Sequence, residues 1–184
     1  SGKSTLLNLI SLIDKPSRGF IKLDNFKINE NDIDQKDTIR SKKIGIIYQD
    51  KNLLSDFTTL ENVYMARLSM SNNRKKAIMD AKSLIKKVGL EKRLDHFPSE
   101  LSGGESQRVA ISRALINSPD IILADEPTGN LDHKNATEIF KLLFSLKNKK
   151  RIIIFATHNR YFADMSDCKL SLINGKVNTV NARN

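Results

Sequence analysis

The sequence predicts an α/β fold with a parallel sheet covered by helices. Three runs rich in β-branched residues have the length of buried strands, at 44–48, 121–124 and 152–156. Segments with helical periodicity separate these runs, and this alternation is typical of parallel strands joined by helical crossovers. The chain has 184 residues, of which 39% are hydrophobic and 28% are charged. That composition suits a single domain, over residues 1–184, with a core of its own.

The first five residues have the composition of a phosphate-binding loop. Residues 2–4 match the last three positions of the pattern G-x-x-x-x-G-K-[ST] and are followed by apolar residues at helical spacing, although so short a match also arises by chance. In such a loop, backbone N–H groups hold phosphates, the lysine reaches the β- and γ-phosphates, and the hydroxyl binds Mg²⁺. The first glycine of the pattern would precede residue 1. The candidate nucleotide contacts are therefore Ser1, Gly2, Lys3, Ser4 and Thr5.

The next segment leads to a second candidate side chain, Gln49. Two short apolar runs, 20–23 and 26–28, predict a β-hairpin, and the polar segment 29–43 leaves room for a short helix. The strand at 44–48 then ends at Gln49. Folds of the α/β class place ligand contacts at the carboxyl ends of strands, although an amide there is also common in a plain turn.

Helical patterns dominate the middle of the chain. They extend over 60–69 and 74–88, with Gly89 as the expected helix end, and no strand pattern interrupts them. We therefore expect a helical subdomain over about residues 50–118, inserted between the first and second strands of the sheet.

A capping box opens the helix expected at 105–117. Ser102 and Glu105 have the spacing at which a hydroxyl and a carboxylate satisfy the free N–H groups of a helix start. An ordinary cap does not require Gly103 and Gly104, because glycine destabilises a helix by about 1 kcal/mol. Two glycines beside free N–H groups make an anion site at the positive end of a helix. A capped helix without a ligand is the alternative.

Two carboxylates follow the strand at 121–124. Asp125 and Glu126 lie at the exit of an apolar run, where a charged side chain costs free energy unless it binds a cation. The pattern matches a Walker B strand, whose aspartate helps to hold Mg²⁺. Glu126 is then placed to polarise a water molecule. An acidic loop without a ligand is the alternative.

The last third of the chain supplies two further candidates, Asp132 and His158. Asp132 lies in the turn before a helix expected at 134–145. His158 follows the third strand, at the same end of the expected sheet as the two carboxylates, although a lone histidine there is usually structural. The chain closes with a hairpin over 169–180 that turns at an Asn-Gly pair.

The charge of the chain leaves several classes of partner open. Its net charge is +10, from 31 Lys and Arg against 21 Asp and Glu, which fits nucleic acid, an anionic membrane or phosphate ligands. The basic residues are scattered in small groups, which favours compositional bias and solvated faces. The single Cys168 argues against a disulfide framework and fits a reducing compartment. No apolar run reaches the roughly 18 residues of a membrane span.

Taken in order, these motifs resemble those of the nucleotide-binding subunit of ATP-binding-cassette (ABC) transporters over essentially the whole chain. The resemblance implies a P-loop NTPase fold with a RecA-like core, antiparallel β elements and an inserted helical subdomain. The matching segments are Gly2 to Thr5 (Walker A), Gln49 (Q-loop), Leu101 to Glu105 (signature), Asp125 and Glu126 (Walker B), Asn130 to Asp132 (D-loop) and His158 (H-loop).

This resemblance implies that the cofactors are ATP and Mg²⁺. Lys3 would bind the phosphates, and Ser4 and Asp125 would hold Mg²⁺, the latter largely through water. Gln49 would contact Mg²⁺ as well, and would carry a signal to the membrane partner. The chemistry asks mainly for positioning and charge neutralisation.

The same resemblance implies a homodimer in which ATP lies between two head-to-tail subunits. Glu126 would be the general base that acts on the attacking water, and His158 would contact the γ-phosphate. Asp132 would link the two sites of the dimer. The signature helix of the other subunit would approach the γ-phosphate through Ser102, Gly103 and Gly104.

The segment 52–63 resembles the Q-loop flank of the lipoprotein-releasing type of this family and of its macrolide-efflux and cell-division relatives, and the stretches 156–159 and 163–167 favour the lipoprotein-releasing type. The lipoprotein-releasing type implies an ATPase that integral-membrane permease subunits hold at the cytoplasmic face of the bacterial inner membrane, where it energises lipoprotein release towards the outer membrane. The alternatives are the ATPase of a related efflux, import or cell-division complex and, more remotely, a non-transport ATPase acting on nucleic acid or ribosomes. The chain shows neither the long coiled-coil arms nor the second cassette of such non-transport members, so we expect no direct contact with nucleic acid.

Several family features would lie before Ser1. These are the aromatic residue that stacks on adenine, the strand that leads into the P-loop and the first P-loop glycine. The sequence is therefore expected to be truncated within the Walker A motif and to lack its N-terminal strands. We expect residues 1–184 alone to bind ATP poorly and to be unstable, because a central strand would be missing.

Overall fold

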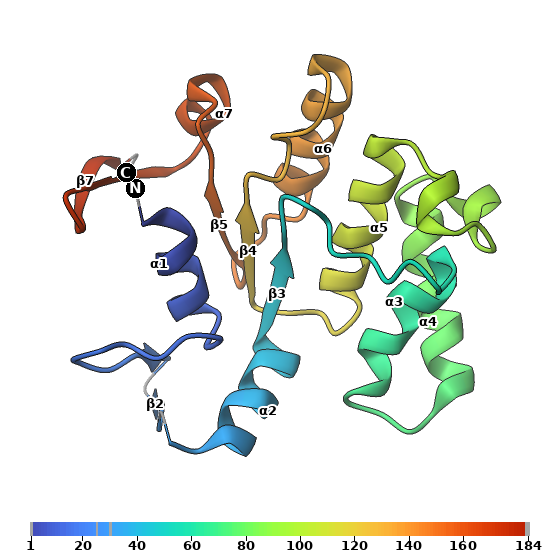
Figure 1. The fold of residues 1–184 in the computed structure, drawn as a ribbon, viewed down its shortest axis with the longest axis horizontal. Helices are drawn as coiled ribbons and strands as arrows, with labels where there is room; N and C mark the ends of the chain where they lie inside the picture. Colours follow the sequence, from blue (N-terminus) through green and yellow to red (C-terminus); the bar gives the residue numbers. More distant parts are fainter. Residues whose placement is uncertain (1, 25, 30, 183–184) are drawn as a thin grey trace.

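The computed structural model describes residues 2–24, 26–29 and 31–182, and a parallel three-stranded sheet lies at its centre (Figure 1). The strands lie in the order β3, β4, β5, and the first residue of each strand pairs with the first residue of the next. Ser1, predicted as a phosphate contact, lies outside the described residues. The strands are β3 (Ile44–Ile47), β4 (Ile121–Asp125) and β5 (Ile152–Ala156).

Helices cover both faces of this sheet because its side chains alternate between two cores. Leu123 packs on one face with Leu7 of α1, while Ile122 packs on the other face with Ile111 of α5 and Ile139 of α6. Figure 1 shows α1 on one side of the strands and α5 on the other. The bounds are α1 (Lys3–Ile10), α5 (Gly103–Leu115) and α6 (His133–Ser145).

The C-terminal part of α5 lies against β3 at a position that only glycine permits. A Cβ atom added to Gly45 would come within 2.5 Å of the carbonyl oxygen of Ala114 and within 3.0 Å of Cγ of Pro119. Backbone atoms cannot yield to such a contact as a flexible side chain can. This close approach fixes α5, and therefore its N-terminal signature residues, relative to the sheet.

The middle of the chain folds as the predicted helical subdomain, with its own apolar cluster. Val63, Ala81, Ile85 and Val109 are fully buried in this cluster. Because α5 contributes to this cluster and to the core above the sheet, it joins the subdomain to the rest of the molecule. The other elements are α3 (Thr59–Leu68), α4 (Arg74–Lys87) and the 3₁₀ turns η1 (Glu91–Arg93) and η2 (Pro98–Glu100).

Smaller elements surround the sheet. Two antiparallel hairpins form, as the sequence predicts, and β6 lies beside the start of α1, since a Cβ at Gly2 would be 3.0 Å from Cδ2 of Leu172. Asn25, in the predicted turn of the first hairpin, lies outside the described residues. These elements are β1 (Lys22–Leu23), β2 (Phe26–Lys27), α2 (Ile33–Lys43), α7 (Arg160–Asp164), β6 (Cys168–Ile173) and β7 (Lys176–Ala182).

Two local predictions need correction. The helix predicted at 105–117 begins at Gly103, so both signature glycines lie in its first turn. The short helix α7 was not predicted; the side chain of Asn159 caps it by accepting hydrogen bonds from the N–H groups of Tyr161 and Phe162. Within the described ranges, none of the helices combines the length and apolar character that a membrane crossing requires.

Candidate active site at the end of the sheet

Three of the predicted site residues meet beyond the carboxyl ends of β4 and β5. The ammonium nitrogen of Lys3 lies 3.3 Å from both ring nitrogens of His158 and 3.9 Å from Oε1 of Glu126. Nε2 of His158 lies 3.5 Å from the same carboxylate oxygen. Glu126 is the most buried of the three, with 17% of its side chain exposed, against 28% for Lys3 and 80% for His158. A buried anion thus faces two nitrogen-bearing side chains at an open edge.

The local backbone explains why Glu126 reaches this place. Its φ of 42° is in the left-handed region, which costs a residue with a side chain on the order of 1 kcal/mol. Its N–H donates to the carbonyl oxygen of Ala156 at 2.9 Å, which ties the exit of β4 to the end of β5. The turn therefore holds the carboxylate next to the segment that carries His158.

One atom of this cluster lacks a hydrogen bond. Oε1 of Glu126 is buried, and among the described residues it has no hydrogen-bond partner, since Nζ of Lys3 and Nε2 of His158 lie 3.9 and 3.5 Å away. A buried carboxylate oxygen without a donor costs on the order of 1–3 kcal/mol. This unmet capacity is what a general base requires, because the base must accept a proton from a bound water.

The N-terminus of α1 provides an anion site beside this cluster. Gly2 is its N-cap with a φ of 83°, and none of the side chains in the described ranges caps the helix start. The N–H groups of the first turn, at Lys3, Ser4 and Thr5, therefore remain available, and the helix dipole adds positive potential. Together with the ammonium group of Lys3, this arrangement suits a phosphate.

The predicted Mg²⁺ ligands offer only oxygen donors. Asp125 is half-buried at the end of β4, and Ser4 is exposed in the first turn of α1. Gln49 follows β3 closely, and its Nε2 would lie 3.3 Å from a Cβ built on Gly129. Among the described residues, no group of three or more His, Cys, Asp or Glu side chains could hold a metal. Such a sparse oxygen set fits Mg²⁺, which usually takes one or two protein ligands together with water and phosphate oxygens.

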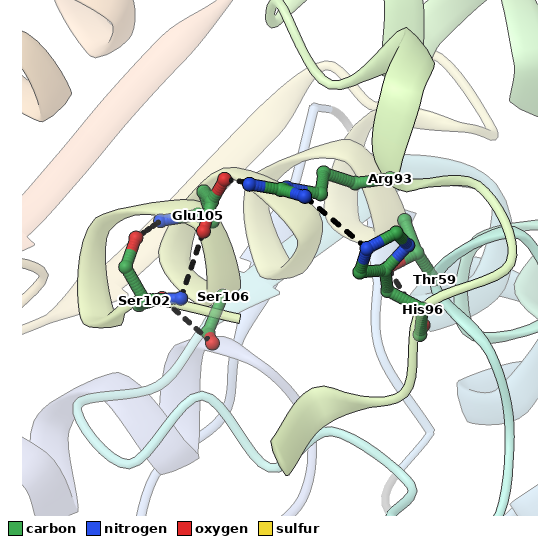
Figure 2. A network of polar contacts seen from close by, with 6 residues as sticks. All are labelled: Thr59, Arg93, His96, Ser102, Glu105 and Ser106. Atoms are coloured by element: carbon green, nitrogen blue, oxygen red, sulfur yellow. Dashed lines mark hydrogen bonds and ion pairs between the residues drawn. The ribbon is translucent and has the colours of Figure 1, made fainter. Parts of the chain in front are cut away.

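The signature residues form the capping box that the sequence predicts. Figure 2 shows Ser102 and Glu105 bonded to each other's backbone: N–H of Ser102 donates to Oε2 of Glu105 at 2.8 Å, and N–H of Glu105 donates to Oγ of Ser102 at 3.2 Å. Nε of Arg93 donates to the other carboxylate oxygen at 2.8 Å. The Arg93 hydrogen bond, followed by that from Ser102, lowers the pKa of Glu105 from 4.5 to about 2. Glu105 is therefore a fixed anion at neutral pH.

Gly104 has a structural role that the sequence does not reveal. It is buried, and a Cβ added there would lie 2.4 Å from Oδ1 of Asn135 in α6. Gly103 is exposed and would meet only Cδ2 of Leu131, at 3.3 Å. Close approach of a ligand was the predicted reason for both glycines; the structure shows that close approach of α6 is a reason for Gly104.

Asp132, the predicted link between two sites, caps α6. Its carboxylate accepts from the N–H groups of Lys134 and Asn135 at 3.0 and 3.1 Å. Hydrogen bonds from the side chain and backbone of Asn135 lower the pKa of Asp132. Because Asn135 also touches Gly104, Asp132 and the signature residues share one neighbourhood at the start of two helices.

The predicted residues thus form two groups rather than one. Figure 1 shows that α1 and α5, which carry the Lys3 and Ser102 groups, lie on opposite sides of the strands. Within the described part of the chain, no hydrogen bond or ion pair joins Ser102 or Glu105 to Lys3, Glu126 or His158.

Sequence reasoning missed the residues that hold the loop after Gln49. Asn62 is 1% exposed; its Oδ1 accepts from N–H of Leu54 at 2.8 Å, and its Nδ2 lies 3.0 Å from the carbonyl of Leu54 and 2.9 Å from that of Phe57. Arg113 of α5 donates to two further carbonyls of this loop, at 2.6 and 2.7 Å. Single Asn and Arg residues on helices carry no distinctive sequence signal, and only the fold shows their partners.

Comparison with known proteins finds a matching family and many similar sequences. The family described as "ABC transporter" matches residues 1–129. The lipoprotein-releasing system ATP-binding protein LolD of Rickettsia bellii is 48% identical over 179 residues, which are 97% of this chain and 79% of that protein. The LolD 2 protein of Chlorobaculum tepidum is 44% identical, over 96% of this chain and 74% of that protein.

Two solved structures are similar in fold. The dimeric ATP-binding cassette MJ0796 in a post-hydrolysis state bound to ADP and Pi superimposes with a TM-score of 0.85 at 37% identity, over 98% of this chain and 82% of that one. The protein cbiO1 from Clostridium perfringens, part of the ABC transporter complex cbiONQ, gives a TM-score of 0.83 at 32% identity, over 96% of this chain and 70% of that one.

Proposed function

Since the chain belongs to the ABC transporter family, in which it is an ATP-hydrolysing cassette, we propose that it energises the release of lipoproteins from the bacterial inner membrane towards the outer membrane. The observation that carries the enzymatic part is the meeting of Lys3, Glu126 and His158 at the end of the sheet. The lipoprotein part is supported by relatives of 44–48% identity that bear the name of the lipoprotein-releasing system.

The cluster supplies the groups that hydrolysis of a phosphoanhydride needs. The N–H groups at the start of α1 and the Lys3 ammonium hold the phosphates of ATP in place. Glu126 accepts the proton of the attacking water through the buried oxygen that lacks a donor. His158, 3.5 Å from that oxygen, is placed to donate to the terminal phosphate and to orient it for attack.

Three oxygen-bearing side chains would hold Mg²⁺ beside this cluster. They are the Ser4 hydroxyl, the Asp125 carboxylate and the Gln49 amide oxygen, and their number leaves coordination positions for water and phosphate. When bound, Mg²⁺ neutralises charge on the phosphates. Asp125 adds a further role of its own: it ends β4 and so fixes the position from which the Glu126 turn departs.

A second copy of the chain completes the site. The signature group lies on the other side of the sheet from Lys3, so each group contributes one part of the proposed nucleotide site. In a head-to-tail homodimer, the α5 N-terminus of one subunit, with Ser102 and Gly103, faces the phosphates held by the other. The related cassette MJ0796 has been solved as a dimer in two structures, one of them bound to ADP and Pi. Asp132, next to the signature group, then lies close to the interface.

The membrane contact runs through partner proteins. None of the described helices suits a membrane crossing, and the name of the relatives describes the ATP-binding component of a releasing system. We propose that the chain works at the cytoplasmic face of the inner membrane, where ATP is available, as a peripheral subunit on integral-membrane permease subunits; the name of the relatives supports this proposal.

The decisive variant is Glu126→Gln in the full-length protein. Assembled with its permease in lipid vesicles that carry a lipoprotein, the unaltered protein should release lipoprotein only with Mg²⁺ and ATP. Glu126→Gln should bind ATP but hydrolyse it about 10²–10⁴-fold more slowly, and release should fall in parallel. Glu138→Gln, an exposed change on α6, is the matched control. Near-normal turnover of Glu126→Gln would remove this residue as the base, and ATP hydrolysis without lipoprotein release would refute the substrate.

A further inference from the structure

Arg93 joins the signature helix to the helical subdomain. Its Nε donates to Oε1 of Glu105 at 2.8 Å, and its Nη1 lies 3.1 Å from Nε2 of His96 (Figure 2). The Glu105 carboxylate uses its second oxygen to hold N–H of Ser102. One guanidinium group therefore contacts the capping box on one side and a ring from the preceding segment on the other.

The contact continues from His96 to the start of α3. The carbonyl oxygen of His96 accepts from N–H of Thr59 at 2.8 Å and from its Oγ1 at 3.2 Å. Thr59 is fully buried, and Thr58 before it ends the loop that begins after Gln49. A continuous set of polar contacts thus leads from this loop to the first turn of α5, as Figure 2 shows for its central part.

Arg93 also affects the electrostatics of the first turn of α5, because it lies next to the negative charge of Glu105. Glu105 is ionised at neutral pH and lies in the turn whose N–H groups are to face a phosphate. A carboxylate there repels an anionic ligand unless a cation compensates it. Arg93 supplies this cation, because its Nε forms an ion pair with Oε1 of Glu105 at 2.8 Å.

We propose that Arg93 is a positioning residue for ATP-driven dimerisation, which fixes the first turn of α5 relative to α3 and compensates the charge of Glu105 beside the incoming phosphate. This inference rests on the proposed head-to-tail dimer. It concerns the signature half of the site, so ATP binding by the Lys3 half of the same subunit does not depend on Arg93.

The chemistry of arginine matters here. Its planar guanidinium has five donors in a fixed fork, which lets Nε and Nη1 serve two acceptors at once. A lysine keeps the positive charge but has a single nitrogen, which cannot reach Glu105 and His96 in the same geometry. Arg93→Lys therefore separates charge compensation from positioning.

The test uses the full-length protein with Glu126→Gln, which traps ATP. Addition of MgATP should convert it to dimers, measured by sedimentation. In that background Arg93→Ala should raise the ATP concentration needed for half-dimerisation by about tenfold, the scale of one charged hydrogen bond. Arg93→Lys should give an intermediate value. ADP binding to the monomer, measured by nucleotide fluorescence, should stay unchanged in both variants.

Two further variants decide the cause. Arg93→Ala with Glu105→Gln should recover part of the loss, because the uncompensated anion is gone. Asp80→Ala, which breaks the ion pair of Arg67 in the same subdomain, is the structural control and should leave dimerisation unchanged. Unchanged dimerisation of Arg93→Ala, or an equal loss in Asp80→Ala, would overturn the proposal. If the Glu126→Gln parent itself stays monomeric with MgATP, the proposed dimer fails instead, and that outcome is distinct.

Discussion

The two adjacent signature glycines lie in different environments. Gly104 is packed against Asn135 of α6, whereas Gly103 is exposed beside a flexible leucine side chain. A methyl group on residue 104 would meet the Asn135 side chain, whose residue also donates its backbone N–H to Asp132. A methyl group on residue 103 would meet only Cδ2 of Leu131. Gly104 is therefore required for the packing of α5 on α6, whereas Gly103 leaves the N-terminal surface of α5 exposed.

This difference predicts unequal effects of alanine. Gly104→Ala should lower the free energy of unfolding by about 1–3 kcal/mol, the usual cost of overpacking, while Gly103→Ala should change it by less than about 1 kcal/mol. Urea unfolding of both variants measures this. Adding Asn135→Ala to Gly104→Ala should restore much of the loss; equal stability of the two single variants would show that the α6 contact is unimportant.

Glu105 gives a pH-dependent prediction. Its folded-state pKa is lowered to about 2, so its ionised form stabilises the fold above its unfolded-state pKa of 4.5, and this contribution is lost as the pH falls from about 4.5 towards 2. The shift corresponds to about 3 kcal/mol, which screening of the partly exposed Arg93 reduces to roughly 1–2 kcal/mol.

Glu105→Gln should therefore be less stable than the unaltered protein at pH 7 by this amount, and the gap should narrow between pH 4.5 and pH 3. Urea unfolding at a series of pH values checks both parts. A gap that stays constant with pH would mean that the charge of Glu105 does not contribute.

Local patterns in the sequence pick out the candidate site residues but not the residues that hold them in place. Lys3, Glu126 and His158 follow strand ends or precede a helix at fixed short spacings, and such local patterns are visible in one sequence. Arg93 and Asn135 matter because of how α5 packs against η1 and α6. Those contacts depend on the assembled fold, and no local pattern specifies them.

At the scale of elements, the loop after Gln49 is held from two sides. Asn62 on α3 binds its backbone from within, and Arg113 on α5 binds it from the other helix. Burial of the Arg113 guanidinium lowers the pKa of this group, which nevertheless stays charged. Since both Asn62 and Arg113 lie on helices of the subdomain, we expect the loop to follow any displacement of these helices.

Asn62→Ala should release this loop. The variant leaves the N–H of Leu54 and several carbonyl groups without partners, so the free energy of unfolding should fall by about 2–3 kcal/mol. Hydrogen exchange of the Leu54 amide should accelerate before global unfolding. Asn117→Ala, which removes a hydrogen bond to Ala66 in the same subdomain, is the control and should leave the loop protected. Equal acceleration in both variants would argue against a specific anchor.

Elements themselves were predicted closely, apart from their ends. The three strands, the central helices and the Asn-Gly hairpin follow from β-branched runs and helical periodicity, which reflect burial on one or two faces. The same patterns did not predict the exact start of α5 or the presence of the helix α7. The cap Ser102 was identified, but the two glycines after it are poor helix formers, so the predicted helix began two residues late. The cap of α7, Asn159, is a single residue in a polar segment.

At the scale of the whole molecule, the sheet separates the two groups that we propose as halves of a nucleotide site. The packing of α1 on one face and α5 on the other follows from the alternation of side chains along β4. Because Gly45 brings α5 into direct contact with β3, the distance between the halves is built into the core. In the proposed homodimer, the Lys3 group of one subunit and the signature group of the other face the same nucleotide.

Mixing two inactive variants of the full-length protein tests this central claim most directly. In the Glu126→Gln background, Lys3→Ala disables the phosphate half and Gly103→Asp disables the signature half. Neither variant alone should trap ATP in a dimer, while their mixture should trap about one ATP per mixed dimer, because one of its two sites pairs the intact halves. Trapping by Gly103→Asp alone, or no trapping in the mixture, would contradict a site shared between subunits.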